Sequence, residues 1–379
     1  MNQLHIRLLM ADTGGGHRAT AEALASSLSA LDPGARVDVV DLFEAAGGLG
    51  RVPPLWYAWL TTHPRVWAAL FHGLNGRHRR VGVWAPFYYP QRRTYDRIFM
   101  AEAPHALVVL HPGFTAAVGR AVARAEVKPA LCTVVTDPIT GHASWYEHRV
   151  DLTLVSTEAA AIRARALGVE PSEIEVMDHP VHPRIPPLSL ERARLRRRYD
   201  WMDRQVVLCT GGGDAGGALR RLVRRLHREA GLHLVVVCGR NRAIARDLGR
   251  LPGVEVLGFV DDLPERMAAA DVVVTKAGPS TLAEAGAVGT PIVVYDHMPG
   301  QEVGNLEWVS SRGWGRIALE LEEVAPAVRA WLGDAVSRAE LHARARKAAL
   351  EAPISDRIAA RLLKEARENR ENRDPGFRN

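Results

Sequence analysis

The chain is poor in cysteine and has no long hydrophobic run, and each shortage excludes a class of protein. Only three of its 379 residues are cysteine, an odd number with no C-x-x-C spacing. That pattern excludes a disulfide framework and a cysteine zinc site, and it fits a reducing compartment. No stretch of 18 apolar residues occurs, and the apolar stretch at the N-terminus is too short for a signal peptide. The sequence therefore predicts a protein that is neither exported nor membrane-spanning.

Common metal signatures are missing as well. The sequence contains no H-E-x-x-H spacing and no prominent D-x-D-like acidic site. We therefore expect neither a bound metal ion nor a tightly bound cofactor. Hydrophobic residues make up 47% of the chain and charged residues 24%. These values are close to the globular average and exclude collagen-like, coiled-coil and wholly disordered chains.

The charge balance is basic, with 49 lysines and arginines against 43 acids and a net charge of +6. Nearly all the basic side chains are arginine. Arginine keeps its charge and binds phosphate or carboxylate in a fork, so anionic partners are favoured. An arginine bias can equally reflect a GC-rich coding genome, so charge alone does not decide the function.

Short apolar runs alternate with alanine-rich helical stretches along the whole chain. This pattern is typical of parallel sheets that are covered by helices on both faces. We therefore predict an α/β protein with two Rossmann-like, doubly wound domains. The predicted strands lie in 5–12, 35–43, 106–112, 130–138, 151–157 and 174–180 of the first half, and in 205–213, 232–239, 254–259, 271–278, 290–297 and 315–319 of the second.

A proline-rich segment, residues 179–190, separates the two halves. Proline at this density is incompatible with a helix interior or a central strand, so we expect an interdomain linker there. The predicted domains are residues 1–185 and 186–335. Residues 336–379 are predicted to form helices and a polar tail, with the last sixteen residues frayed.

Residues 51–99 break the composition of the rest of the chain. They hold eleven of the 23 aromatic residues and eight arginines, but only one acid, Asp96. Such a stretch can dock on an anionic membrane surface, because tryptophan, tyrosine and arginine favour that interface. Aromatic residues among arginines can also stack on nucleic-acid bases. The structural alternative is a helical excursion whose aromatic side chains pack onto the sheet.

Two glycine-rich turns follow the first strand of each half. The first, TGGGH at residues 13–17, places His17 where a helix begins, and the second is TGGGD at residues 210–214. Glycines let the backbone approach a ligand, and a helix start offers N–H groups and a positive dipole end to an anion. His17 can act as a general base, because the ordinary pKa of histidine lies near neutrality. The alternative is a capping turn that binds nothing.

A third motif, KAGPSTLAEA at residues 276–285, follows the strand DVVVT. Gly278, Ser280 and Thr281 open a helix whose amides and hydroxyls can hold a diphosphate, and Glu284 lies one turn later, within reach of a ribose diol. After the next strand, residues 301–302 supply an amide and an acid suited to sugar hydroxyls. The alternatives are a solvated helix position for Glu284 and a loop acid for residue 302.

Asp137 and His111 also end strands of the first half. Since the carboxyl ends of parallel strands share one edge of a sheet, both can lie near His17. A carboxylate beside His17 would fix its tautomer or stabilise its protonated form. Any single one of the fifteen histidines is nonetheless more often structural.

Four segments resemble those of a known family: DTGGGHRATAEAL, TVVTDPITGHASWY, KAGPSTLAEA and PGQEVGN. The resemblance is to the monogalactosyldiacylglycerol synthases and the processive diacylglycerol glucosyltransferases, relatives of the N-acetylglucosaminyltransferase that makes lipid II. It covers roughly residues 6–330. It implies a GT-B fold with an interdomain cleft, UDP-glucose or UDP-galactose as the donor substrate, and diacylglycerol in an anionic membrane as the acceptor.

The resemblance also implies roles for individual residues. His17, helped by Asp137, would be the catalytic base of an inverting, single-displacement transfer. The enzyme would be cytoplasmic and peripheral on the inner face of the cell membrane. Residues expected to bind the donor are Gly15, Gly16, Gly212, Gly213, Phe259, Val260, Lys276, Gly278, Pro279, Ser280, Thr281, Glu284, Gln301, Glu302 and Asn305. Residues expected at the membrane or acceptor are Trp56, Trp59, Trp67, Arg79, Arg80, Trp84, His111, Phe114 and Trp145.

Three other functions share parts of this pattern. A sugar-nucleotide epimerase would use the same scaffold and donor loop but would need no aromatic and basic surface. A non-catalytic sensor would bind a nucleotide sugar without consuming it. A nucleic-acid-binding protein would use the arginines and show steep salt dependence. We expect no nucleic-acid partner, and the sequence leaves the oligomeric state and the choice between glucose and galactose open.

Overall fold

The computed structural model describes residues 3–12, 15–48, 52, 56, 59–60, 63–76, 88–212 and 217–373. The predictions for Arg79, Arg80, Trp84 and Gly213 concern residues outside these ranges. The chain divides into two compact units. Unit 1 comprises Met1–Pro183, Pro299–Gln301 and Ile354–Asn379, and unit 2 comprises Arg184–Met298 and Glu302–Pro353.

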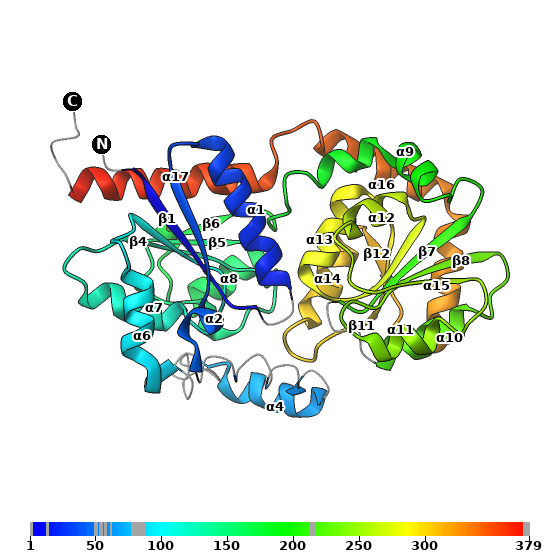
Figure 1. Cartoon of the computed structure of the whole chain (residues 1–379), viewed down its shortest axis with the longest axis horizontal. Helices are drawn as coiled ribbons and strands as arrows, with labels where there is room; N and C mark the ends of the chain where they lie inside the picture. The colour runs from blue at the N-terminus through cyan, green and yellow to red at the C-terminus, as the bar shows by residue number, and fades with distance from the viewer. Residues whose placement is uncertain are drawn as a thin grey trace. The chain divides into compact units, whose positions relative to one another are not determined.

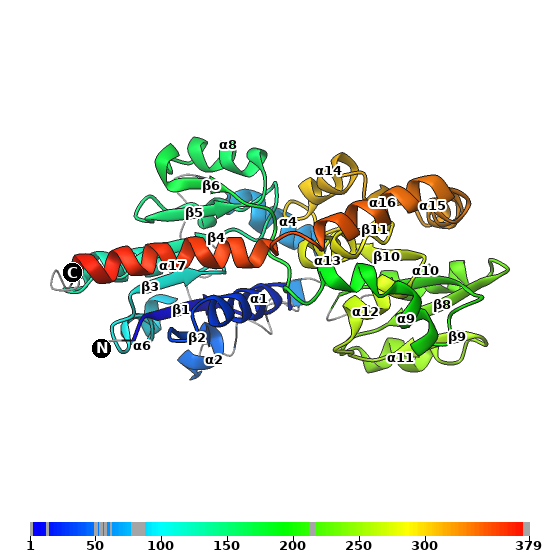
Figure 2. The same ribbon diagram turned by 90° about the horizontal axis from the view of Figure 1, so that it is seen from above.

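Unit 1 is built on a six-stranded parallel sheet in the order β2-β1-β3-β4-β5-β6 (Figure 2). Successive side chains of a strand point to opposite faces, so Leu8 and Leu9 of β1 lie in different hydrophobic clusters. The strands are β1 (His5–Met10), β2 (Arg36–Asp41), β3 (Ala106–Val109), β4 (Ala130–Val134), β5 (Leu152–Val155) and β6 (Ile174–Val176).

Helices cover both faces of this sheet. On one face α1 (Gly16–Leu31) and α17 (Ile354–Arg373) lie side by side (Figures 1 and 2) and bury Leu24 and Leu362 against the strands. The opposite face packs against α2, α6 and α7. The remaining helical segments are α2 (Leu42–Ala46), α4 (Pro64–Leu74), η3 (Tyr89–Gln91), α6 (Arg92–Met100), α7 (Thr115–Arg124), η4 (Ala143–Trp145), α8 (Glu158–Ala166) and η5 (Pro171–Glu173).

Unit 2 has a second parallel sheet, in the order β12-β11-β10-β7-β8-β9. Its strands are β7 (Gln205–Thr210), β8 (Leu232–Val237), β9 (Val254–Leu257), β10 (Val272–Lys276), β11 (Ile292–Asp296) and β12 (Gly315–Ile317). Its helical segments are η6 (Pro186–Leu190), α9 (Arg192–Arg198), α10 (Gly217–Leu226), α11 (Arg242–Leu248), α12 (Leu263–Ala269), α13 (Pro279–Val288), α14 (Val303–Ser311), α15 (Leu321–Gly333) and α16 (Ala335–Ala348).

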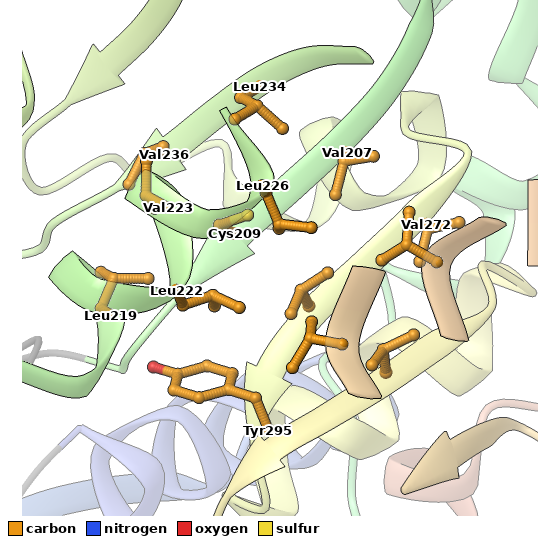
Figure 3. Close-up of a cluster of buried hydrophobic side chains, with 14 of the residues drawn as sticks. Val207, Cys209, Leu219, Leu222, Val223, Leu226, Leu234, Val236, Val272 and Tyr295 are labelled. Atoms are coloured by element: carbon orange, nitrogen blue, oxygen red, sulfur yellow. The ribbon is translucent and has the colours of Figure 1, made fainter. Parts of the chain in front are cut away.

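The core of unit 2 shows why α10 packs where it does (Figure 3). Leu219, Leu222, Val223 and Leu226 recur at the three- and four-residue spacing that places them on one helix face, and all are buried. That face meets β-branched side chains of β7, β8 and β10. Burial of each such side chain contributes roughly 1.5–3 kcal/mol.

The predicted α/β class, with two parallel sheets, is confirmed. Each predicted strand segment contains one of the observed strands. The boundary between the units falls between Pro183 and Arg184, inside the proline-rich segment. Part of that segment forms η6, a short 3-10 helix with prolines at its first positions, where no backbone N–H is needed.

The C-terminal segment, for which helices and a frayed polar tail were expected, contains α16 and α17. α16 groups with unit 2, but α17 groups with unit 1. α17 extends to Arg373, so residues 364–373 are helical rather than frayed. A buried stripe that includes Leu362 and Ala366 holds this charged helix on the sheet of unit 1.

Candidate active site

The strand order of each unit identifies one place where ligands bind in parallel sheets. The order reverses between β1 and β3 in unit 1 and between β7 and β10 in unit 2. At such a switch point the neighbouring loops leave in opposite directions and open a crevice at the carboxyl edge of the sheet. The glycine-rich turns follow β1 and β7, and the KAGPST motif follows β10. The motifs found in the sequence therefore lie at both switch points.

His17 is the second residue of α1, directly after the turn that leaves β1. Gly15 caps this helix with a left-handed φ of 90°, a conformation that side-chain-bearing residues rarely adopt. Asp12 holds the turn from the end of β1. Its carboxylate accepts a hydrogen bond from the Gly15 N–H at 3.1 Å and another from Arg18 Nε at 3.0 Å. These hydrogen bonds fix the start of α1 and therefore the backbone position from which the His17 side chain extends.

The surroundings of His17 keep its imidazole neutral at pH 7. Burial lowers the pKa of His17 to about 4, and this effect outweighs the hydrogen bond to the Leu110 carbonyl and the charge of Asp12, which both raise the pKa. His17 as a whole residue is half-buried. A neutral imidazole that donates one N–H to the Leu110 carbonyl retains a lone pair on its other nitrogen. His17 can therefore accept a proton from a substrate.

The loops after β3 and β4 supply the other groups around His17. The His111 ring lies edge-on at 4.7 Å between ring centroids, and the Trp145 ring lies at 6.1 Å. The Thr136 hydroxyl oxygen is 3.4 Å from Nδ1 of His17. Burial holds the pKa of His111 well below its ordinary value, and the neighbouring His17 adds to this effect. The site therefore holds two neutral histidines in contact.

Asp137 has a different set of partners from the one expected. Its Oδ2 accepts a hydrogen bond from the Trp145 indole Nε1 at 2.6 Å, and its Oδ1 accepts one from Gln301 Nε2 at 3.3 Å. Gln301 belongs to unit 1. The carboxylate whose charge acts on the pKa of His17 is that of Asp12. A direct role for Asp137 beside His17 stays a prediction.

In unit 2, three residues form a cradle around Lys276, the last residue of β10: Gly212 after β7, Gly278 before α13, and Glu302, the N-cap of α14. Gly212 has a φ of 79°, and a Cβ placed on it would lie 3.1 Å from Lys276 Cε. Lys276 Nζ lies 3.6 Å from Glu302 Oε1. Glu302 is buried, and its Oε2 accepts a hydrogen bond from the Met298 N–H at 2.7 Å. Gly278, the N-cap of α13, lies beside the same two side chains. The structure thus brings four of the predicted donor-binding residues together.

α13 begins at Pro279 and carries Ser280 and Thr281 in its first turn. Glu284 follows one turn later. Burial raises the pKa of Glu284 to about 7, against the weaker opposing effect of Arg184. Glu284 is half-buried, so it is not the fully solvated position that was named as the alternative, and its role toward a ribose stays a prediction. Asn305 is buried, and its side-chain amide donates to the Ala277 carbonyl at 2.7 Å, so it supports the turn that precedes α13.

Phe259 and Val260 follow β9 at the same edge of the sheet. The ring of Phe259 is 61% exposed, and the guanidinium carbon of Arg240 lies 5.6 Å from its centroid. Arg240 comes from the loop after β8. An exposed aromatic ring beside a guanidinium can stack on a planar ligand group.

The residues predicted at the acceptor or membrane divide into two groups. Trp67, Phe114 and Trp145 are buried. For Trp67, which lies in segment 51–99, this agrees with the core packing named as the alternative, and the acceptor or membrane role of all three stays a prediction. Trp59 is 48% exposed and its ring stacks on His63. Trp56 is half-buried against the cluster that contains Phe114. Within the described ranges, no helix is both long and apolar enough to cross a bilayer.

Asp12 is the residue that the motif analysis passed over. It stands directly before the quoted glycine turn and at the carboxyl end of β1. A carboxylate in that place commonly accepts hydrogen bonds from turn amides, and this signal could have identified it. Among the described residues, no group of three or more histidine, cysteine or acidic side chains could hold a metal ion.

The chain is similar in sequence to known family models and proteins. Residues 17–181 match the monogalactosyldiacylglycerol (MGDG) synthase model, and residues 206–305 match the glycosyltransferase family 28 C-terminal domain. A probable monogalactosyldiacylglycerol synthase 2 of Oryza sativa subsp. indica is 32% identical over 352 residues, which cover 86% of this chain and 73% of the relative. The Spinacia oleracea monogalactosyldiacylglycerol synthase is 32% identical over 346 residues, covering 86% and 66%.

Solved structures share the fold at low sequence identity. Acinetobacter baumannii MurG has a TM-score of 0.61 at 16% identity and covers 95% of this chain and 99% of its own. Staphylococcus aureus MnaA, solved with UDP, has a TM-score of 0.61 at 12% identity, with 95% and 96% covered. Anabaena HepE, solved with UDP and glucose, has a TM-score of 0.56 at 15% identity, with 95% and 100% covered.

Proposed function

The chain belongs to the monogalactosyldiacylglycerol synthase family and is a hexosyltransferase of the GT-B fold, as the resemblance predicted. On this premise we propose that it transfers a hexose from a UDP-sugar to the 3-hydroxyl of membrane diacylglycerol. The observation that carries the proposal is the neutral imidazole of His17 at the switch point of unit 1. A transferase needs a base at the acceptor hydroxyl, and His17 has the lone pair for it.

The donor is held by the switch point of unit 2. The N–H groups at the start of α13 and the ammonium of Lys276 offset the charge of the diphosphate. In unit 2, Glu302 is suited to the sugar hydroxyls and Glu284 to the ribose diol. Two of the fold neighbours were solved with UDP, and a uridine nucleotide is what we propose for this chain as a member of the same fold. Phe259 and Arg240 form the surface that meets the base.

The reaction is a single displacement at the anomeric carbon. The acceptor hydroxyl oxygen forms a bond to C1 of the hexose, and the bond from C1 to the β-phosphate oxygen breaks with its electron pair going to UDP. His17 takes the hydroxyl proton and becomes an imidazolium. The nearby charge of Asp12 stabilises this cation. Attack opposite the leaving group inverts the configuration of C1, and no glycosyl-enzyme forms.

The acceptor side faces a lipid surface in this proposal. The exposed ring of Trp59 and the exposed residues of α4, such as Val66, are suited to an interface between water and lipid. The protein would be peripheral on the inner face of the cell membrane. The net charge of +6 favours an anionic leaflet.

The relatives bear on two choices, galactose against glucose as the sugar and a transferase against an epimerase as the function. Names of the relatives at about 30% identity or more give a monogalactosyl product, so we propose UDP-galactose as the donor in preference to UDP-glucose. A putative UDP-N-acetylglucosamine 2-epimerase also shares the fold, but at 14% identity. Identity at that level reflects the scaffold alone, so it does not favour an epimerase.

The test is a transfer assay with analysis of the lipid product. The purified chain is incubated with diacylglycerol in anionic vesicles and with either labelled UDP-galactose or labelled UDP-glucose. We expect a β-linked monohexosyl lipid from the α-configured donor, with galactose transferred faster. An α-linked product would contradict the single displacement. Absence of any lipid product with both sugars would contradict the proposed function.

A further inference from the structure

The loop that follows β4 carries Asp137 and Trp145, and residues of α8 and α4, with their caps, hold it by hydrogen bonds. Thr157, the N-cap of α8, donates its hydroxyl to the Pro138 carbonyl at 2.5 Å. Arg163 of α8 donates Nε to the Gly141 carbonyl at 2.5 Å. The third bond comes from α4, where Oδ1 of Asn75 accepts the Ala143 N–H at 2.8 Å.

Asn75 joins two of these supports, the one from α4 and the one from Arg163. It is the C-cap of α4, and the same Oδ1 also accepts a hydrogen bond from Arg163 Nη2 at 2.7 Å. The Ala143 N–H belongs to the first residue of η4, so it has no partner within that turn. Ala143 and Trp145 are both fully buried. Loss of the Asn75 oxygen would leave a buried N–H without an acceptor, which is costly.

The turn held by Asn75 carries a group of the proposed active site. Trp145 ends η4, and its indole Nε1 donates to Asp137 at 2.6 Å while its ring lies 6.1 Å from that of His17. A second α4 residue supports the same turn, because the Phe71 ring packs at 5.1 Å against that of His142, the N-cap of η4. α4 therefore acts on the site through η4 and not by touching a substrate.

We propose that Asn75 is a positioning residue: its side-chain oxygen, together with Arg163, fixes η4 and so holds the Trp145 indole on the carboxylate of Asp137. The inference rests on the proposed function for its kinetic consequence, but the geometry that it assigns belongs to unit 1 alone. α4 also lies within the aromatic and basic segment 51–99. Trp67 and Phe71 of this helix are buried, while many of its other residues are exposed.

Two variants of Asn75 separate positioning from general stability. Asn75→Ala removes the oxygen that Ala143 and Arg163 share. Asn75→Asp keeps an oxygen acceptor at the same place and should retain at least half of the wild-type kcat. The matched control is Asn369→Ala on α17, which removes a half-buried amide that donates to the Lys128 carbonyl and touches neither η4 nor Arg163. It should leave kcat and the NMR spectrum of Trp145 unchanged.

The first readout does not depend on activity. The indole Nε1–H of Trp145 should resonate downfield, because a short hydrogen bond to a carboxylate is strong. Its signal is assigned by its loss in Trp145→Phe. We expect Asn75→Ala to move this signal upfield and Asn75→Asp to keep it. An unchanged Trp145 signal in a folded Asn75→Ala protein overturns the proposal.

The second readout is kinetic. We expect Asn75→Ala to lower kcat about tenfold with the UDP dissociation constant and the KM for a short-chain, monomeric diacylglycerol within about twofold of wild type. If Asn75→Ala does not fold, Arg163→Met takes its place, because it removes the bonds to Gly141 and Asn75 and should shift the same indole signal. A folded Arg163→Met protein with an unshifted signal also overturns the proposal. A wild-type chain that transfers no hexose contradicts the proposed function, while the indole signal still decides the role of Asn75.

Discussion

At the scale of single residues, the site depends on how burial competes with neighbouring polar groups. Around His17, burial favours the neutral ring, while the Leu110 carbonyl and Asp12 favour the charged one. Burial is the larger effect, so the ring is a lone-pair acceptor at neutral pH. Burial also favours the neutral form of Glu284. For an acid the neutral form is the protonated one, so the pKa of Glu284 rises to about 7 where that of His17 falls.

The pH dependence of the reaction follows from the pKa of His17. A base is inactive when protonated, so kcat/KM should fall as pH drops through about 4 and should show no inflection near 6.5 that belongs to this residue. Initial rates between pH 3.5 and 8 with the monomeric acceptor measure this profile, and circular dichroism confirms that the chain stays folded at each pH. If the rate on the low-pH side of the profile is half-maximal near pH 6.5 because His17 is protonated there, the burial of the ring is contradicted.

The cradle around Lys276 gives a second prediction at this scale. Gly212→Ala places a Cβ 3.1 Å from Lys276 Cε at a left-handed φ, so it should displace the ammonium and weaken UDP binding about tenfold. Gly231→Ala is the matched control, because its φ of 77° is nearly the same but nothing lies within 4 Å of its Cβ. Isothermal titration with UDP compares the two. Equal weakening by both variants would remove Lys276 from the donor site.

At the scale of elements, the strands were predictable, but the length of the last helix and the unit on which it packs were not. Buried parallel strands read as compact apolar runs, and each of these runs forms a strand. α17 instead combines many charged residues with a narrow buried stripe. Pairs at four-residue spacing, such as Arg361 with Glu365, lie along its surface and are compatible with a helix. The many charged residues of α17 suggested a frayed tail. The sequence alone does not show that the narrow apolar stripe between them packs on unit 1.

The stripe of α17 predicts a stability effect. Leu362 is fully buried against the sheet of unit 1, so Leu362→Ala should lower the free energy of unfolding of that unit by about 2–5 kcal/mol. Leu31→Ala on the neighbouring helix α1 makes the same change at a side chain that is 46% exposed, and it should cost below about 1 kcal/mol. Urea unfolding followed by hydrogen exchange of the β1 amides compares the variants. Similar values for both would mean that α17 does not stabilise unit 1.

At the scale of the whole molecule, the sequence predicted two doubly wound units with the chemical motifs at the carboxyl ends of strands, and the observed strand order then put these motifs at the switch points. Those features depend on local patterns and strand order. The partners of Asp137, the contact of His17 with the loops after β3 and β4, and the bond from Asn75 to Ala143 join residues far apart in the chain. No spacing rule in one sequence predicts such pairs, because they depend on how helices pack over the sheet.

The central claim is that His17 of this family member removes the acceptor proton while unit 2 binds the donor independently of it. The most direct measurement compares the wild type with His17→Ala in two assays, UDP binding by titration and hexose transfer to diacylglycerol under single-turnover conditions. Loss of a general base predicts transfer slower by about 10²–10⁴-fold with the UDP dissociation constant unchanged within about twofold. Transfer at the wild-type rate, or loss of UDP binding together with transfer, would contradict the account.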